Sequence, residues 1–251
     1  MESVDIKRVQ ARLLEIGITI SRILENHNIP YMLTGGTLLG AIRHGGFIPW
    51  DDDFDLYLFD DTYDEAVDFL RAELPTDMFL EDEKTEPLFY HGWARVKDLY
   101  SEAVYRKVEE SPYELYTYQG LKVDMFRCKK IHSSELLSYR LDEMRKYLKR
   151  LLDKNLITED VFHQKNVFLT NKIETEEKNK PLEDCFVFGM PTTYRCQLEA
   201  DVLPLKKTSF CGIDFLVPNN PEKILSQFYG DYMQLPEVKD RVGHYSMVKF
   251  L

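Results

Sequence analysis

An acidic cluster that runs directly into an apolar segment is the feature that most limits how this chain can fold. Residues 51–58 read Asp-Asp-Asp-Phe-Asp-Leu-Tyr-Leu, with four carboxylates within five positions. Carboxylates held this close repel one another, and a charge beside a buried apolar strand is costly unless something compensates it. A solvated run of charge at the end of a loop is the simpler alternative. The flanking apolar residues, Trp50 before the cluster and Leu56 within its end, favour a folded site that holds a cation.

Alternation within this segment predicts a strand from Asp53 to Phe59. Side chains two residues apart on a strand share a face, so Asp53 and Asp55 point one way while Phe54 and Leu56 point into the core. Two carboxylates on one face suit Mg²⁺, which takes one or two carboxylates and completes its shell with water and phosphate oxygens. The segment therefore predicts a magnesium site at the start of a strand.

A glycine pair precedes the acidic cluster. We expect a short strand at Tyr31–Thr34, a turn at Gly35-Gly36 and a short helix at Thr37–Arg43. Backbone N–H groups at a glycine turn that opens a helix can bind a phosphate group. Gly-Gly alone is weak evidence, but its position before an Asp-apolar-Asp strand points to a phosphate site beside the metal site.

A third carboxylate is expected on a neighbouring strand, and Asp124 between Val123 and Met125 provides it. An aspartate at the surface of an edge strand would give the same local pattern. Together with Asp53 and Asp55, however, Asp124 is the natural third metal ligand or the general base.

The remaining periodicity predicts a single domain over residues 1–251. An apolar stripe predicts a helix from Ile6 to Ile23. A helix after Thr62 would begin with a capping box to Glu65, and residues 113–118 and 121–127 could pair as a hairpin. The fold class is α/β (α+β), a mixed sheet flanked by helices. Its core would span residues 30–130, with a helical insertion at 131–180 and an irregular C-terminal block at 181–251.

The composition excludes several classes of protein. A net charge of −11 disfavours binding to nucleic acid, which needs basic surface to meet phosphates. No apolar run approaches the roughly 20 residues that cross a bilayer. The N-terminal segment lacks the pattern of a secretory signal, so we expect a cytoplasmic protein. The four cysteines show no zinc-ligand spacing and are expected to be free thiols: Cys128, Cys185, Cys196 and Cys211.

The run from Tyr31 to Leu58 closely resembles the signature of the LicD family. That family includes bacterial phosphocholine transferases and the related domains of fukutin and fukutin-related protein. Val123-Asp124-Met125-Phe126 looks like its second acidic motif, and Phe215–Pro236 resembles its C-terminal block. The segment Ala94–Asp98 looks like its basic strand, whereas residues 131–201 match little of the family.

The resemblance implies a nucleotidyltransferase-like fold and a magnesium-dependent phosphotransferase. The donor would be a CDP-alcohol, CDP-choline first, and CMP would be released. The acceptor would be a sugar hydroxyl on a cell-surface glycan precursor of the teichoic acid or lipopolysaccharide type, either free or lipid-linked. The protein would then meet the membrane only peripherally, at its inner face.

Site residues follow from the same resemblance. Asp53 and Asp55 would bind one or two Mg²⁺ ions, with Mn²⁺ as the alternative ion. Asp124 would bind a metal or accept the proton of the acceptor, and Asp51 and Asp52 would complete or support the metal shell. The expected substrate contacts are Gly35, Gly36, Thr37, Arg43, His44, Trp50, Arg95, Lys97, Tyr229 and His244.

Three other functions fit parts of the pattern. A metal-dependent glycosyltransferase also uses Asp-x-Asp, but normally builds a longer nucleotide-binding unit before it. A nucleotidyltransferase would attach a nucleotide and release pyrophosphate instead of CMP. A non-catalytic acidic module would bind a metal ion without turnover.

Overall fold

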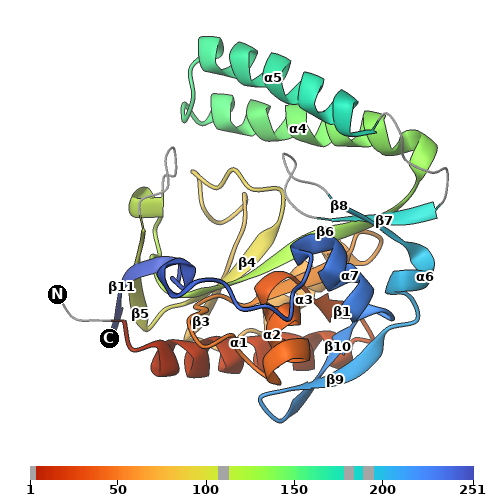
Figure 1. Cartoon of the computed structure of the whole chain (residues 1–251). Helices are drawn as coiled ribbons and strands as arrows, with labels where there is room; N and C mark the ends of the chain where they lie inside the picture. Colours follow the sequence, from red (N-terminus) through yellow and green to blue (C-terminus); the bar gives the residue numbers. More distant parts are fainter. Residues whose placement is uncertain (1–3, 107–112, 178–183, 189–194) are drawn as a thin grey trace.

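The computed structural model describes residues 4–106, 113–177, 184–188 and 195–251, and a mixed sheet flanked by helices forms its centre (Figure 1). The sheet has seven strands. Five follow the order β1-β2-β6-β4-β3, and β7 and β8 extend from the far half of β6. Only the pair β2–β6 is parallel, and the other neighbours are antiparallel. The expected α+β class is confirmed.

The elements have the following bounds. The helices are α1 (Ile6–Asn26), α2 (Gly35–His44), α3 (Tyr63–Glu73), α4 (Leu136–Asp153), α5 (Glu159–Glu177), α6 (Glu199–Val202) and α7 (Pro221–Tyr229). The sheet strands are β1 (Tyr31–Leu33), β2 (Asp55–Phe59), β3 (Met78–Glu81), β4 (Ala94–Asp98), β6 (Lys122–His132), β7 (Asp184–Phe188) and β8 (Arg195–Leu198). Two separate ribbons pair β5 (Ser101–Tyr105) with β11 (Tyr245–Phe250), and β9 (Lys206–Phe210) with β10 (Ile213–Val217).

Helix α1 packs along the sheet with the predicted apolar stripe. Val9, Leu13, Ile16 and Ile20 are fully buried, as expected for residues spaced three and four apart. Gly17 lets the helix approach the acidic segment closely, because a Cβ at this position would lie 2.8 Å from the ring of Phe54. The start of α1 also meets the end of β11, where the guanidinium of Arg8 lies 4.1 Å from the ring centre of Phe250. The two ends of the described chain therefore lie on the same side (Figure 1).

Helices α4 and α5 lie side by side above the sheet (Figure 1) and have an apolar core of their own. This core includes Tyr90 from the segment before β4, and it is separate from the main cluster around the sheet. Among the described residues, no helix is both long and apolar enough to span a bilayer.

Two local predictions are wrong. Residues 113–118 do not pair with 121–127: Tyr113–Leu115 forms a short 3₁₀ turn, and β6 takes β2, β4 and β7 as partners instead. The side chain of Thr62 does not cap α3, since its hydroxyl donates to the carbonyl of Phe59. The C-terminal part is more regular than expected, because it contains the β9–β10 ribbon, α7 and β11.

Candidate active site

The start of α2 lies against two carboxylates of the acidic cluster. A Cβ on Gly36 would lie 2.6 Å from Oδ2 of Asp51, and one on Gly35 would lie 3.2 Å from Oδ2 of Asp55. Gly35 also has φ +55°, a left-handed conformation that favours glycine. Side chains at these positions would push the carboxylates away. The glycine pair therefore allows backbone N–H groups and acidic oxygens to share one small space.

Strand β2 begins with Asp55, which lies directly beside Asp124 of β6 in the parallel register. The backbone N–H of Asp124 donates to the carbonyl of Phe54 at 3.2 Å, which fixes this alignment. Asp53 lies two residues before the strand, which was predicted to begin at Asp53 and begins at Asp55. The expected meeting of Asp53, Asp55 and Asp124 is thus present: in addition to burial, the charge of Asp124 raises the pKa of Asp53 and of Asp55, and the charge of Asp53 raises the pKa of Asp55.

The cluster lacks sufficient positive charge of its own. Burial, followed by the negative charge of Asp53, raises the pKa of Asp51 to about 8. Burial raises the pKa of Asp53 as well, and burial with the charges of Asp53 and Asp124 raises the pKa of Asp55 well above its ordinary value. Raised carboxyl pKa values mean that ionising these groups together is unfavourable. A divalent cation would remove that cost, and hard carboxylate oxygens are the ligands that Mg²⁺ prefers.

Histidine 244 joins the cluster from the opposite end of the chain. One oxygen of Asp51, one oxygen of Asp53 and one ring nitrogen of His244 lie within 4.8 Å of one another, close enough to share a metal ion. A hydrogen bond to Asp52, opposed by burial and reinforced by the charge of Asp53, raises the pKa of His244 to about 9. In the absence of a metal, a protonated His244 is one of the cations that face the acidic cluster.

Asp52 holds the C-terminal segment in place. Its Oδ1 accepts hydrogen bonds from the backbone N–H of His244 at 2.6 Å and from Nδ1 of His244 at 3.0 Å. Its Oδ2 accepts from the backbone N–H of Tyr245 at 2.9 Å. Although burial alone would raise it, the pKa of Asp52 is lowered by these donors. Both oxygens therefore accept hydrogen bonds from the C-terminal segment, and Asp52 positions His244 beside the cluster.

Neighbouring positive charges and a hydrogen-bond donor stabilise the ionised form of Asp124. Nε1 of Trp93 donates to Oδ1 at 3.0 Å, and Nζ of Lys122 pairs with Oδ2. Burial would raise its pKa, but the positive charges of Lys122 and Arg95 hold that pKa well below its usual range. Lys122 was not predicted from the sequence. Its spacing is the signal that could have revealed it, since Lys122 and Asp124 are two apart on one strand and share a face.

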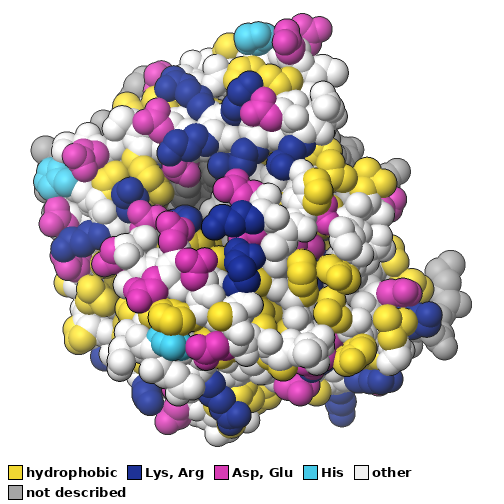
Figure 2. Space-filling model, turned by 180° about the vertical axis from the view of Figure 1, so that it is seen from behind, with side chains coloured by type: hydrophobic (Ala, Val, Ile, Leu, Met, Phe, Trp, Pro, Cys, Tyr) yellow, Lys and Arg dark blue, Asp and Glu magenta, His cyan; other side chains and the backbone are white. Residues whose placement is uncertain are grey.

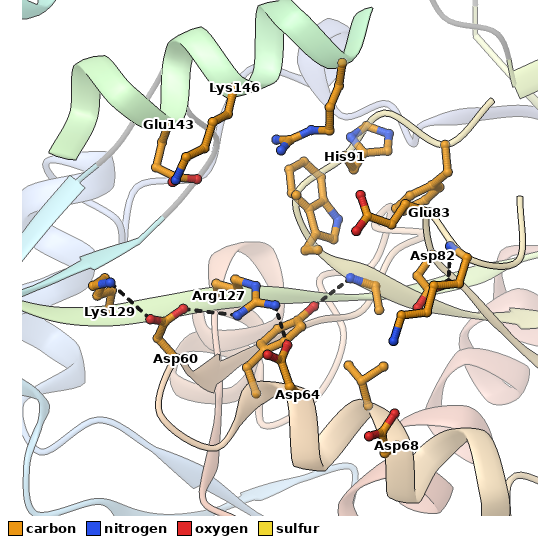
Figure 3. Close-up of a pocket in the computed structure, with 18 of the residues that line it drawn as sticks. Asp60, Asp64, Asp68, Asp82, Glu83, His91, Arg127, Lys129, Glu143 and Lys146 are labelled. Carbon is orange, nitrogen blue, oxygen red and sulfur yellow. Dashed lines mark hydrogen bonds and ion pairs between the residues drawn. The ribbon is translucent and has the colours of Figure 1, made fainter. Parts of the chain in front are cut away.

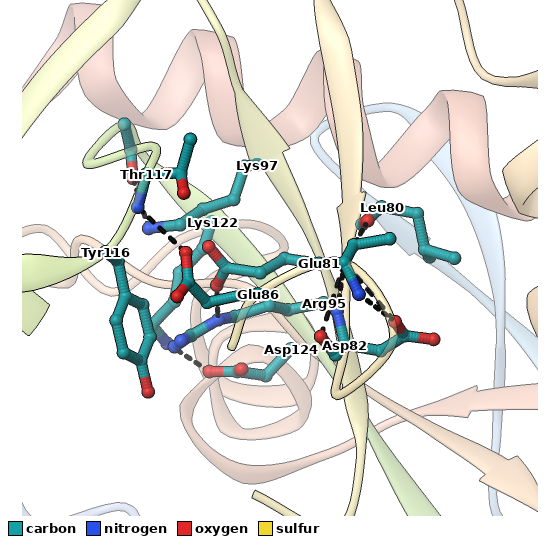
Figure 4. Close-up of polar contacts among 12 residues, drawn as sticks. Leu80, Glu81, Asp82, Glu86, Arg95, Lys97, Tyr116, Thr117, Lys122 and Asp124 are labelled. Atoms are coloured by element: carbon teal, nitrogen blue, oxygen red, sulfur yellow. Dashed lines mark hydrogen bonds and ion pairs between the residues drawn. The ribbon is translucent and has the colours of Figure 1, made fainter. Parts of the chain in front are cut away.

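The two basic residues of β4 are buried behind Asp124 (Figure 4). Arg95 is 0% exposed, and its Nε donates to Glu81 at 2.5 Å. Lys97 is 1% exposed, and its Nζ donates to the carbonyl of Gly120 at 3.1 Å. Neither side chain is accessible to a phosphate group, so we leave both out of the proposed substrate contacts. Arg95 acts on the site through the charge of Asp124.

The other expected contact residues surround the cluster at different depths. The hydroxyl of Thr37 accepts a hydrogen bond from the backbone N–H of Asp55 at 2.9 Å, so it supports the site from behind. Nη1 of Arg43 donates to the carbonyl of Tyr232 at 2.6 Å, with His44 beside it. Tyr229 is 46% exposed, and burial of its hydroxyl followed by the charge of Asp55 raises its pKa to about 12.

Two contacts fix the loop that leads into the cluster. The side-chain amide of Gln10 donates to the carbonyls of Ile48 at 3.0 Å and Asp51 at 2.8 Å. On the outer side, the guanidinium of Arg241 lies 5.0 Å from the ring centre of Trp50. The position of Asp51 thus depends on α1 and on the C-terminal segment, neither of which is close in sequence.

Clustered carboxylates beside a glycine-opened helix have the chemistry to hold a divalent cation together with a phosphate ester. Residues 28–126 match the family described as LicD/FKTN/FKRP, nucleotidyltransferase domain. The resemblance to this family is therefore confirmed for residues 28–126.

Relatives show how far the similarity extends. The lipopolysaccharide cholinephosphotransferase LicD of Haemophilus influenzae is 27% identical, covering 98% of this chain and 97% of that protein. The human ribitol 5-phosphate transferase FKRP is 54% identical, but over 37 residues that make up 15% of this chain and 8% of that protein. An uncharacterised protein of Rickettsia prowazekii is 56% identical over 34 residues, 14% of this chain and 13% of that protein.

Proposed function

We propose that the protein transfers a phospho-alcohol, phosphocholine first, from a CDP-activated donor to a sugar hydroxyl of a cell-surface glycan precursor. The observation that carries this proposal is the carboxylate cluster at the start of α2. The raised pKa values of Asp51 and Asp55 show that the cluster has too little positive charge, which a divalent cation would supply. Full-length similarity to a lipopolysaccharide cholinephosphotransferase supports the choice of phosphocholine and of a glycan acceptor. Similarity to a ribitol 5-phosphate transferase makes ribitol phosphate the next candidate.

The residues divide the work as follows. Asp51, Asp53 and Asp55 would hold Mg²⁺, and His244 faces the same space. Bound there, the ion would supply positive charge to the diphosphate of the donor. The backbone N–H groups at the start of α2 bind the phosphate oxygens. Asp124 stays ionised between Trp93 and Lys122 and orients the acceptor hydroxyl. Positioning and charge neutralisation are what phosphoryl transfer mainly requires.

The reaction balances without another reactant. The acceptor oxygen forms a bond to the phosphorus of the phospho-alcohol, and the bond from that phosphorus to the CMP oxygen breaks. CMP leaves with the bonding electrons, and the hydroxyl proton passes to a carboxylate of the cluster. We place this reaction in the cytoplasm, at the inner face of the membrane where lipid-linked glycans are assembled.

The test is release of CMP. Purified protein is incubated with Mg²⁺, an acceptor glycan and either CDP-choline or CDP-ribitol, and CMP is measured. Asp55→Asn should lower the rate at least about 100-fold, because lost support of a metal site typically costs this much or more. Asp214→Asn, an exposed carboxylate on β10, is the matched control and should retain full activity.

The name of the matching domain supports a second candidate, attachment of a nucleotide with release of pyrophosphate. The same assay with CTP separates the two. Pyrophosphate release from CTP, with no CMP from either CDP-alcohol, would replace the phosphotransferase proposal by this one. Unchanged CMP release by Asp55→Asn in the presence of a chelator would remove the metal from the proposal.

A further inference from the structure

A cavity of about 550 Å³ opens at an edge of β6 (Figure 3). Strand β4 pairs with β6 only from Lys122 to Met125, whereas β6 continues to His132. The part of the β6 edge that β4 does not cover is bordered by α3 below, by α4 above and by the segment 82–93 at the side. Its lining residues include Asp60, Asp64, Asp68, Trp93, Arg127 and Lys146.

Trp93 connects this cavity to the carboxylates. Its side chain lines the cavity, and its Nε1 donates to Asp124 at 3.0 Å. Arg127 and Lys129 line the cavity further along the strand that carries Asp124. At about 3.3 Å per residue, they lie roughly 10 Å and 16 Å from Asp124 along β6. Because three and five positions separate Arg127 and Lys129 from Asp124, their side chains leave the opposite face of β6, so the cavity is linked to Asp124 through Trp93.

The cavity and the glycine turn lie on opposite sides of the cluster. Helix α2 begins after β1, which is next to β2 at one side of the sheet order, whereas the cavity occupies the place next to β6 on the β4 side. In phosphoryl transfer the attacking and leaving oxygens are roughly in line across the phosphorus. If the donor binds at α2, the attacking hydroxyl must therefore approach the phosphorus from the β4 side of the cluster.

The lining suits a carbohydrate. Five basic and six acidic side chains are interspersed with the rings of Tyr63, Phe89, Trp93 and Tyr139. Many charges are already paired, as in Arg127 with Asp60 and Asp64, and Lys146 with Glu143. Figure 2 shows acidic and basic side chains mixed around a hollow on this face. Such a surface is neither apolar enough for a lipid chain nor basic enough for a polyanion, but it offers ring faces and many partners for hydroxyl groups.

Arg150 adds a donor without a partner. Its Nε donates to the carbonyl of Tyr90 at 2.9 Å, while its buried Nη2 has no hydrogen-bond partner among the described residues. Gly92 makes room for it, since a Cβ there would lie 3.0 Å from Nη2. Buried polar groups are normally paired, so an unpaired donor lining a cavity indicates a ligand that accepts a hydrogen bond.

We propose that this cavity binds sugar rings of the acceptor glycan and presents one hydroxyl past Trp93 to Asp124. The role as acceptor site rests on the proposed function. Carbohydrate binding as such does not, and it is tested separately.

Binding is measured through Trp93. The chain has two tryptophans, so Trp50→Phe leaves Trp93 as the only one and makes its fluorescence a reporter of the cavity. The delipidated oligosaccharide of a lipopolysaccharide and a soluble teichoic acid repeat are titrated without donor, beside inorganic phosphate. At least one glycan should change the fluorescence in a saturable way, and phosphate should not. No response to either glycan, or an equal response to phosphate, would overturn the proposal.

Kinetics test the role in transfer. Asp68→Ala on α3 and Lys146→Ala on α4 each remove one exposed lining group. Each should raise the KM for the acceptor about fivefold, the value of one hydrogen bond, and change the KM for the donor less. Glu65→Ala and Arg145→Ala remove exposed charges of the same helices outside the cavity and should change neither.

The two proposals can fail independently. If no CDP-alcohol yields CMP, the proposed function fails, while the fluorescence titration still decides whether the cavity binds carbohydrate. If CMP is formed but the Asp68 and Lys146 variants match their controls in acceptor KM, the acceptor site lies elsewhere and this inference is wrong.

Discussion

Two missing Cβ atoms let the acidic cluster lie against the first turn of α2. Gly36→Ala would place a methyl group 2.6 Å from Oδ2 of Asp51, so this carboxylate must move. We expect a loss of transfer activity of about 10- to 100-fold, because Asp51 would leave the position that it shares with Asp53 and His244. Steady-state assays of CMP release measure the loss, and thermal unfolding shows whether the fold is retained.

Gly45→Ala is the matched control at the other end of α2. Gly45 has φ +69° and nothing within 4 Å of an added Cβ. The alanine should therefore cost about 1 kcal/mol of stability through backbone strain and leave activity at the wild-type level. If Gly36→Ala were as active as Gly45→Ala, the close approach of Asp51 to α2 would have no role in the reaction.

Lys97 is a basic residue whose side chain is buried in the fold. Burial, followed by the charge of Arg95, lowers the pKa of Lys97 to about 7. Between this value and its unfolded value of 10.5, the unfolded chain binds a proton that the folded protein does not, so stability rises with pH. Lys97→Met should remove this rise, which amounts to at most about 1.4 kcal/mol per pH unit. Denaturant unfolding of both proteins between pH 7.5 and 9.5 measures the difference in slope.

A common slope for wild type and Lys97→Met would mean that Lys97 stays charged when folded. The sequence could not reveal this state. Arg95 and Lys97 are two apart on β4 and share a face, but burial of that face depends on packing. The rings of Phe89 and Tyr116 lie 4.8 Å and 5.2 Å from the guanidinium of Arg95. Alternation along a strand predicts on which face a side chain lies, whereas its burial depends on the packing of distant segments.

The same reasoning succeeded where the geometry is local. The two-residue period and the apolar neighbours were sufficient to predict Asp55 and Asp124 on one face of adjacent strands. The partner of Asp52 could not be predicted, since it lies 192 residues away at His244. The hairpin proposed for 113–127 failed for a related reason. Local pairing competes with pairing to β2, β4 and β7, which are more distant in the sequence. No local pattern specifies the order of these strands.

Among the elements, β11 is the one whose attachment can be tested most directly. It pairs with β5 along one edge and is fixed at its start by the carboxylate of Asp52. Asp52→Ala should release this start and withdraw His244 from the cluster. We expect faster hydrogen exchange at Tyr245 and a loss of activity of about 10- to 100-fold, as for other partners that orient a metal site.

Lys249→Ala serves as its control, because it removes an exposed side chain of β11 that lies 3.7 Å from Glu102 and does not contact the cluster. Exchange at Tyr245 should remain as in the wild type. Unchanged exchange and activity in Asp52→Ala would show that β11 is held by its pairing with β5 alone.

The stability of the entire protein should depend on the cation. In chelator, the carboxylates repel one another, so Asp55→Asn should raise the melting temperature by a few degrees. Mg²⁺ should stabilise the wild type by about 2.7 kcal/mol at 100 times its Kd, and the variant much less. Differential scanning fluorimetry with and without Mg²⁺ measures both effects without any substrate. A Mg²⁺-induced shift of equal size in both proteins would place the ion elsewhere.

The attachment of His244 to Asp52 has a consequence for synthesis. A nascent chain that has left the ribosome only as far as residue 240 can already form β1, α2, β2 and β6, yet it lacks the strand that delivers the histidine. Such a chain would lack both the histidine that faces the aspartates and the contact of Arg241 with Trp50 beside them. Termination after residue 240 would therefore yield a chain that lacks β11 and the histidine and should release no CMP.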